Sequence, residues 1–237
     1  MNAFYRQAIA QSVFGFGFFI ALIFLTAGTW DYWQGWLFLA VFAASTAGFT
    51  LYLAIFDKPL LKRRLEAGPW HERRRSQQVI VSLVYVAFFA FLILPILDYR
   101  YGRSRVPAWG SVVGDAIIVL SFLAIFRVVR VNSWAASNVR VEAGQQVIDT
   151  GPYAHVRHPM YASAIWLFVG IPLALGSWRT LALLVRRVAA IQHLDNSVAA
   201  WGYDHRSAAS TRGLKAITEL GNIRIVIGFA LVLVLLD

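Results

Sequence analysis

The sequence predicts an all-α fold, a polytopic membrane helical bundle with about five transmembrane helices. Hydrophobic residues make up 59% of its 237 residues and charged residues only 14%, whereas a soluble domain averages about 45–50% and about 25%. The apolar residues gather in runs of about 20, the length with which a helix crosses a bilayer while pairing its own backbone groups. Proline, glycine or charged residues bound each run, so the runs predict separate helices.

Four runs are long enough to span a bilayer, and they cover residues 12–28, 33–56, 78–97 and 108–127. The first has the alternative of a cleaved signal peptide. We expect it to be retained, because the apolar run is long and Ala27-Gly28-Thr29 is a weak cleavage site. A fifth apolar element, residues 161–185, is either one helix broken near Pro172 and Gly176 or a tight hairpin.

The basic residues predict the orientation of the bundle. Residues 57–77 hold seven of them, whereas the turn at 28–33 has none and the loop at 98–107 has three: Lys58, Lys62, Arg63, Arg64, Arg73, Arg74 and Arg75 against Arg100, Arg103 and Arg105. Lysine and arginine accumulate in cytoplasmic loops. We therefore expect an integral protein of a bacterial inner membrane, with the amino terminus and residues 127–158 in the cytoplasm.

The net charge and the absence of cysteine exclude some binding partners and some kinds of site. The net charge is +10 and cysteine is absent, which excludes disulfides, zinc thiolate sites and a cysteine nucleophile. The basic residues lie between apolar runs, where they meet anionic headgroups. We expect the lipid bilayer as a partner, no nucleic acid and no metal, and the oligomeric state stays open.

Three charged residues near the fourth run have two readings each. Asp115 lies inside the run, where an acidic residue is a functional hypothesis or makes a local helix contact near the interface. Arg127 and Arg130 are three residues apart at the cytoplasmic end. They snorkel to headgroups, or one of them faces a cofactor.

Residues 132–161 form a cytoplasmic loop of about 30 residues, a length that in a compact domain points to function. At its end, Pro159 suits the first position of a helix and places His158 at the cap. Free N–H groups with the Arg157 guanidinium and the His158 imidazole suit a carboxylate or phosphate. The alternative is that Arg157 and His158 anchor the helix to anionic lipid.

The motif Gly151-Pro152-Tyr153 followed by Val156-Arg157-His158-Pro159-Met160-Tyr161 resembles the signature of the isoprenylcysteine carboxyl methyltransferase family, which is related to the phospholipid N-methyltransferases. The likeness covers about residues 15–180, through 27–34, 132–133 and 172–178. Arg-His-Pro alone also occurs in sterol reductases that use a nicotinamide cofactor.

The resemblance implies S-adenosylmethionine as cofactor and an amphipathic or prenylated substrate that enters from the bilayer. Methyl transfer to the carboxylate of an isoprenylcysteine-like lipid needs no general base, since that group is ionised at neutral pH. An amine acceptor would need one, with His155 or His158 nearest. Arg157 is a candidate for an electrostatic role. The implied cofactor-binding residues are Gln145, Gln146, Val147, Ile148, Tyr153, His158, Pro159, Met160 and Tyr161.

The likeness ends after Trp178, which divides the chain into a methyltransferase-like domain at 1–185 and an atypical tail at 186–237. The family continues with a pair of acidic residues, and Glu219 is the only glutamate after Glu142. The tail is either a divergent lid or the product of a shifted reading frame near 179–188, and we favour the second. Two other functions stay open: a sterol-reductase-like NADPH-dependent membrane reductase, and a non-catalytic relative.

Overall fold

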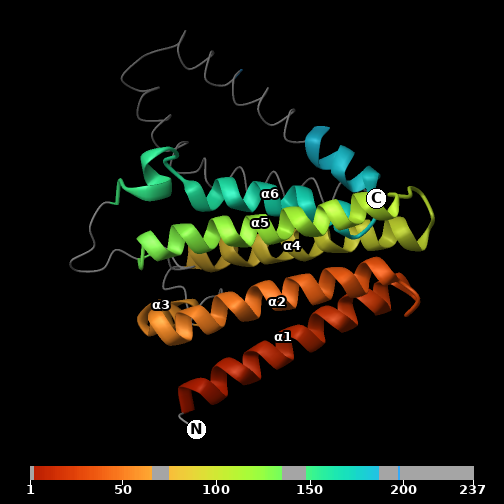
Figure 1. Ribbon diagram of the computed structural model, residues 1–237. Helices are drawn as coiled ribbons and strands as arrows, with labels where there is room; N and C mark the ends of the chain where they lie inside the picture. Colours follow the sequence, from red (N-terminus) through yellow and green to blue (C-terminus); the bar gives the residue numbers. More distant parts are fainter. Residues whose placement is uncertain (1–2, 66–74, 135–147, 187–196, 198–237) are drawn as a thin grey trace.

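The computed structural model describes residues 3–65, 75–134, 148–186 and 197. These residues form helices and no strand, so the predicted all-α fold is confirmed for this part of the chain. The helices are α1 (Ala3–Ala27), α2 (Trp33–Phe56), α3 (Lys58–Leu65), α4 (Arg75–Arg100), α5 (Ala108–Val131), the 3₁₀ helix η2 (Gly151–Ala154) and α6 (Pro159–Ala174). The long helices lie side by side as one bundle (Figure 1).

Among the residues that the structure describes, four helices are long and apolar enough to cross a membrane, and they match the four predicted runs. The spans are Ala8–Ala27, Trp33–Phe56, Gln77–Arg100 and Ala108–Val131. The fifth predicted element differs, because α6 has 16 residues. That length is about 24 Å of helix, short of the roughly 30 Å of a hydrocarbon core.

The chain turns back after α6 instead of continuing as one broken helix. Gly176 has a φ of +81°, and its N–H donates to the Leu173 carbonyl while that of Ser177 donates to the Pro172 carbonyl. This pair of bonds with a left-handed glycine is a Schellman motif, which ends a helix. The backbone N–H of Thr180 then donates to Ser177 Oγ at 3.0 Å, and residues 178–186 are helical. The tight-hairpin alternative is the one observed (Figure 1).

Helices α5 and α6 approach so closely that two glycines are needed between them. A Cβ on Gly114 would clash with the Ala174 nitrogen and lie 2.7 Å from Leu173 Cβ, and one on Gly170 would lie 2.9 Å from the Gly114 carbonyl oxygen. Small residues at such contacts let membrane helices pack backbone to backbone. Helices α5 and α6 therefore pack as a rigid pair, which fixes the positions of the residues at both ends of the two helices.

Hydrogen bonds hold together the end of the bundle that carries the turn after α1, which we call the Asp31 end. The Tyr32 hydroxyl donates to the Leu175 carbonyl oxygen at 2.6 Å, and the Tyr99 hydroxyl donates to the Asp31 carbonyl oxygen at 2.7 Å. The buried carboxylate of Asp98 accepts from Ser177 Oγ at 2.6 Å and also from Ser104 Oγ. We call the opposite end, which carries α3 and η2, the α3 end.

Asp115 is buried in α5 with an exposed fraction of 5%. Neither carboxylate oxygen has a hydrogen-bond partner in the part of the chain that the structure describes, and Ser111 Oγ, one turn earlier, has none there either. Asp115 lies next to Gly114, which packs against α6, so a local helix contact is present beside it, and a functional role of its carboxylate stays a hypothesis.

Candidate functional site

A cavity of about 740 Å³ opens at the α3 end, between the last two turns of α5, η2 and the first turn of α6. Its volume lies within the roughly 300–1,000 Å³ of small-molecule sites. The walls are mainly apolar, with two guanidinium groups and one imidazole. The lining residues are Ala124, Arg127, Val128, Arg130, Val131, Gly151, Pro152, His155, Val156, Pro159, Ala162 and Ser163.

The sequence around η2 shapes the floor of the cavity. Gly151 has a φ of +59°, and a Cβ at this position would lie 3.0 Å from Val131 Cγ2. Glycine thus lets η2 pack against the end of α5 in a conformation that other residues rarely adopt. The Ser163 hydroxyl donates to the Pro159 carbonyl oxygen at 2.9 Å, so it is engaged within α6.

Asn132, the C-cap of α5, connects η2 to the bundle. Its Nδ2 donates to the Tyr153 hydroxyl at 2.7 Å, and its Oδ1 accepts from the Trp134 N–H at 3.0 Å. The same amide therefore fixes the chain that leaves α5 and the one that returns to α6. This pair holds two walls of the cavity at a fixed spacing.

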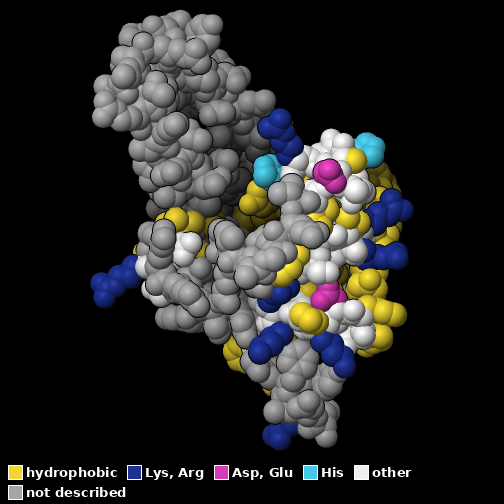
Figure 2. Space-filling view, turned by 90° about the vertical axis from the view of Figure 1, so that its left-hand side faces the viewer, with side chains coloured by type: hydrophobic (Ala, Val, Ile, Leu, Met, Phe, Trp, Pro, Cys, Tyr) yellow, Lys and Arg dark blue, Asp and Glu magenta, His cyan; other side chains and the backbone are white. Residues whose placement is uncertain are grey.

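Helix α3 packs against the same region. The Arg63 guanidinium donates to the Ser133 carbonyl oxygen at 3.1 Å and lies over the Trp134 ring at 4.7 Å. Figure 2 shows Lys and Arg side chains spread over this end of the bundle, with few carboxylates among them. No acidic residue is among the described residues that line the cavity, so its electrostatic potential favours an anionic group.

Of the nine predicted cofactor residues, Gln145, Gln146 and Val147 lie outside the described residues. Pro159 lines the cavity, and Tyr153 lies behind its wall, bonded to Asn132. Ile148 and Met160 are half-buried and are not among the lining residues.

The remaining predicted residues lie on another face of α6. The His158 and Tyr161 rings lie 5.5 Å apart, and Tyr161 is 71% exposed. With 3.6 residues per turn, Tyr161 lies about 200° around the helix from Pro159. Arg157 is exposed as well. The structure thus brings part of the Arg-His-Pro segment to the cavity and turns the rest away from it.

Three polar residues on the cavity wall were not among the predicted cofactor residues. Arg127 and Arg130 come from the last turns of α5, and His155 comes from the segment after η2. The spacing of Arg127 and Arg130 could have indicated a shared site, because residues three apart lie on the same face of a helix. The two arginines were predicted either to reach lipid headgroups or to place one side chain against a cofactor, and both line the cavity.

The geometry suits a ligand with an anionic group and an apolar or aromatic body. Arg127 and Arg130 supply charge-assisted donors, and the valine and alanine side chains supply apolar wall. His155 Nδ1 lies 3.4 Å from the Gly151 carbonyl oxygen, which leaves its other ring nitrogen for a ligand or a proton.

The comparison with protein families adds one finding. Residues 109–195 match the phospholipid methyltransferase family. That range includes every residue that lines the cavity. It is shorter at its start than the likeness described from the sequence, which begins at about residue 15, and it continues past Trp178, where that likeness ends. The similarity is to the family related to the isoprenylcysteine carboxyl methyltransferases, not to these in particular. No curated protein and no solved structure matches the chain.

Proposed function

We propose that this protein is an integral membrane methyltransferase that uses S-adenosylmethionine to methylate an amphipathic lipid. One observation carries the proposal: the cavity at the α3 end is built wholly from residues within the range 109–195 that matches the phospholipid methyltransferase family. The position of the cavity at one end of a bundle whose described part has four helices long enough to span a bilayer supports the proposal, because a lipid headgroup and a water-soluble cofactor can meet there.

The residues present fit two parts of the cofactor, its carboxylate and its nucleoside. When bound, S-adenosylmethionine supplies a methyl group activated on a sulfonium. Arg127 and Arg130 would hold its carboxylate, and the apolar wall formed by Val128, Val131 and Val156 would cover its nucleoside. From the resemblance, residues 145–148 would make further contacts, as would Pro159, the residue of the Arg-His-Pro segment that lines the cavity.

The protein's own contribution is then to position the reactants and exclude water. The Asn132–Tyr153 hydrogen bond fixes η2 against α5, and the glycine contacts fix α5 against α6. A rigid site that aligns donor and acceptor lowers the entropic part of the barrier. A carboxylate acceptor, as in an isoprenylcysteine-like lipid, would require no proton transfer.

The matched family favours a second acceptor, the amine of a phospholipid. An amine must lose a proton when it is methylated, and His155 on the cavity wall is placed to accept it. The two acceptors give different products. A methyl ester is cleaved by mild base, whereas an N-methyl group is stable to it.

Purified protein in mixed lipid and detergent micelles, supplied with S-adenosylmethionine that carries a tritiated methyl group, tests the proposal. We expect label in the lipid extract. Its release by mild base as volatile methanol identifies an ester, whereas label that stays non-volatile after the same treatment identifies an N-methyl group. Arg127→Gln should weaken cofactor binding by about 10- to 100-fold, the value of a hydrogen bond to a charged group. Arg103→Gln, at the Asp31 end, is the matched control and should bind as the wild type does.

Three results would oppose the proposal. Binding of NADPH without binding of S-adenosylmethionine would support a sterol-reductase-like enzyme. Cofactor binding without transfer to any lipid would support a non-catalytic relative. Equal affinity in the wild type and Arg127→Gln would place the cofactor elsewhere.

A further inference from the structure

A second cavity, of about 500 Å³, lies at the Asp31 end, where the ends of α1 and α4, the start of α2 and residues 102–106 meet. It is separate from the first cavity. Val106, just before α5, lines the second and Arg127 the first, and the helix from Ala108 to Arg127 is about 28 Å long. No part of the proposed methyl transfer uses this second cavity.

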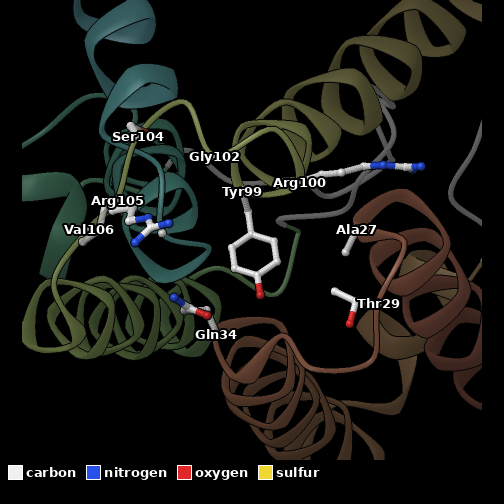
Figure 3. Close-up of a pocket in the computed structure, with 10 residues that line it drawn as sticks. Ala27, Thr29, Gln34, Tyr99, Arg100, Gly102, Ser104, Arg105 and Val106 are labelled. Carbon is white, nitrogen blue, oxygen red and sulfur yellow. The ribbon is translucent and has the colours of Figure 1, made fainter.

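Polar groups from different elements converge on this cavity. Figure 3 shows the Arg105 guanidinium and the Gln34 amide turned toward one another on one side, with the Tyr99 ring beside them. Thr29 and Arg100 line the other side. Gln34 Oε1 is buried without a hydrogen-bond partner among the described residues. This oxygen accepts from a donor such as a guanidinium, so only Nε2 of the amide can donate to an anion.

The charges around the cavity favour an anion. Arg100 donates one N–H to the Thr26 carbonyl oxygen at 3.0 Å, which holds its side chain in place and leaves its other N–H groups. No carboxylate is among the lining residues that the structure describes. The buried carboxylate of Asp98 accepts from the lining residue Ser104 and from Ser177 through Oδ2, and its Oδ1 has no partner among the described residues.

The expected depth of this cavity in the membrane indicates which kind of anion it meets. Large aromatic side chains are exposed around this end of the bundle: Trp30, Trp33, Trp36, Tyr101 and Trp109. Tryptophan and tyrosine accumulate at the headgroup level of a bilayer. The cavity therefore lies at the depth of lipid phosphates.

We propose that the cavity at the Asp31 end binds a phosphate group, with Arg105 as its principal ligand and the Gln34 side-chain N–H₂ group as a further donor. The Arg100 guanidinium, which extends away from these two side chains in Figure 3, adds positive charge at the edge of the cavity. A guanidinium pairs with phosphate through two parallel hydrogen bonds. A phospholipid headgroup and free phosphate present the same group, and the two sources are separated by experiment.

Purified protein is titrated in detergent with dioleoylphosphatidylglycerol, with dioleoylglycerol, which lacks the phosphate, and with inorganic phosphate. The readouts are the midpoint of thermal unfolding and the number of bound lipids in native mass spectrometry. We expect the phospholipid to raise the midpoint and bind, and dioleoylglycerol to do neither. Stabilisation by inorganic phosphate to the same extent identifies the free anion as the source, and its absence identifies the lipid.

The variants locate the site. Arg105→Gln should weaken phospholipid binding by about 10- to 100-fold. Arg103→Gln is the matched control, since Arg103 belongs to the same loop but lies over the Tyr101 ring and does not line the cavity. Arg127→Gln, in the other cavity, should also keep the affinity. Arg105→Lys keeps the charge but not the paired geometry, should bind with intermediate affinity, and replaces the glutamine variant if that one does not fold.

The proposal is overturned if dioleoylglycerol stabilises the protein as well as the phospholipid does. It is also overturned if Arg105→Gln binds like the wild type, or if Arg103→Gln loses as much affinity as Arg105→Gln.

Discussion

The Tyr32 hydroxyl donates a hydrogen bond of 2.6 Å to the Leu175 carbonyl oxygen, and both residues are fully buried. The bond fixes the start of α2 to the turn after α6. Tyr32→Phe would leave that carbonyl without its donor, which costs about 1–3 kcal/mol for a buried group. Tyr99→Phe is the control, because its acceptor on Asp31 is exposed and water can replace the hydroxyl. Equal losses in the free energy of unfolding, measured in detergent, would contradict this ranking.

The same tyrosine predicts a dependence on pH. Burial, with smaller contributions from Tyr99 and Asp98, raises the pKa of Tyr32 above its usual range. Below about pH 10, the ordinary tyrosine pKa, the hydroxyl keeps its proton in both the folded and the unfolded chain. Above it, only the unfolded chain releases the proton, so stability falls as the pH rises. The advantage of the wild type over Tyr32→Phe should be constant between about pH 6 and 9 and shrink above that range. An advantage that varies within that range would contradict the assignment.

Replacing glycine by alanine should have opposite effects on stability at two positions, one inside the contact between α5 and α6 and one outside it. Gly114→Ala would force a methyl group against Leu173 and the backbone of Ala174, and such overpacking costs about 1–3 kcal/mol or more. Gly48→Ala, in α2, meets nothing within 4 Å, and alanine should stabilise this helix by about 0.5–1 kcal/mol. Thermal unfolding of the two variants measures both effects. A Gly114→Ala variant as stable as Gly48→Ala would contradict the close packing.

Hydropathy was sufficient to predict the membrane-spanning helices, because the apolar run of each one ends at a charge or a turn. The run at 33–56 gave both ends of α2. Helix α1 begins at Ala3 and not at residue 12, since polar residues such as Arg6 and Gln7 favour helices without being apolar. Helix α3 was not predicted. Its charges masked Leu60 and Leu61, which are buried against Leu53 and Val129.

The candidate site was predictable only in part, for a physical reason. Pro159 predicted the start of α6, because proline favours the first helical position. Which side chains meet in the cavity depends on how helices are rotated about their axes, which hydropathy does not fix for α6. The pairing of Asn132 with Tyr153 joins residues 21 apart, a separation at which no periodic pattern operates.

That pairing yields a prediction for a positioning residue. Tyr153→Phe removes the hydroxyl that accepts from Asn132 and should weaken binding of S-adenosylmethionine by about 2- to 10-fold, the net value of one hydrogen bond. Asn132→Ala should weaken it further, because the Trp134 contact is lost too. In the Asn132→Ala background, Tyr153→Phe should have no additional effect.

Calorimetric titration of the four proteins in this cycle measures the coupling. Tyr161→Phe is the control: it keeps the ring that the resemblance places near the cofactor, and its side chain is 71% exposed. It should bind as the wild type does. Independent effects of Tyr153→Phe and Asn132→Ala would mean that the hydrogen bond does not support the site.

Two alanines of α6 test which face of the helix meets the cofactor. Ala162 lines the cavity, whereas Ala164, also half-buried, does not and lies about 200° around the helix. Ala162→Leu would add apolar volume inside the cavity and should lower the affinity for S-adenosylmethionine by about 5- to 150-fold, since overpacking of this size costs about 1–3 kcal/mol. Ala164→Leu adds the same group to the other face and should leave the affinity unchanged. Because both variants carry the same substitution on the same helix, a difference in binding at equal thermal stability arises from the position of the cavity. The reverse order of affinities would place the cofactor on the face of α6 that carries Tyr161.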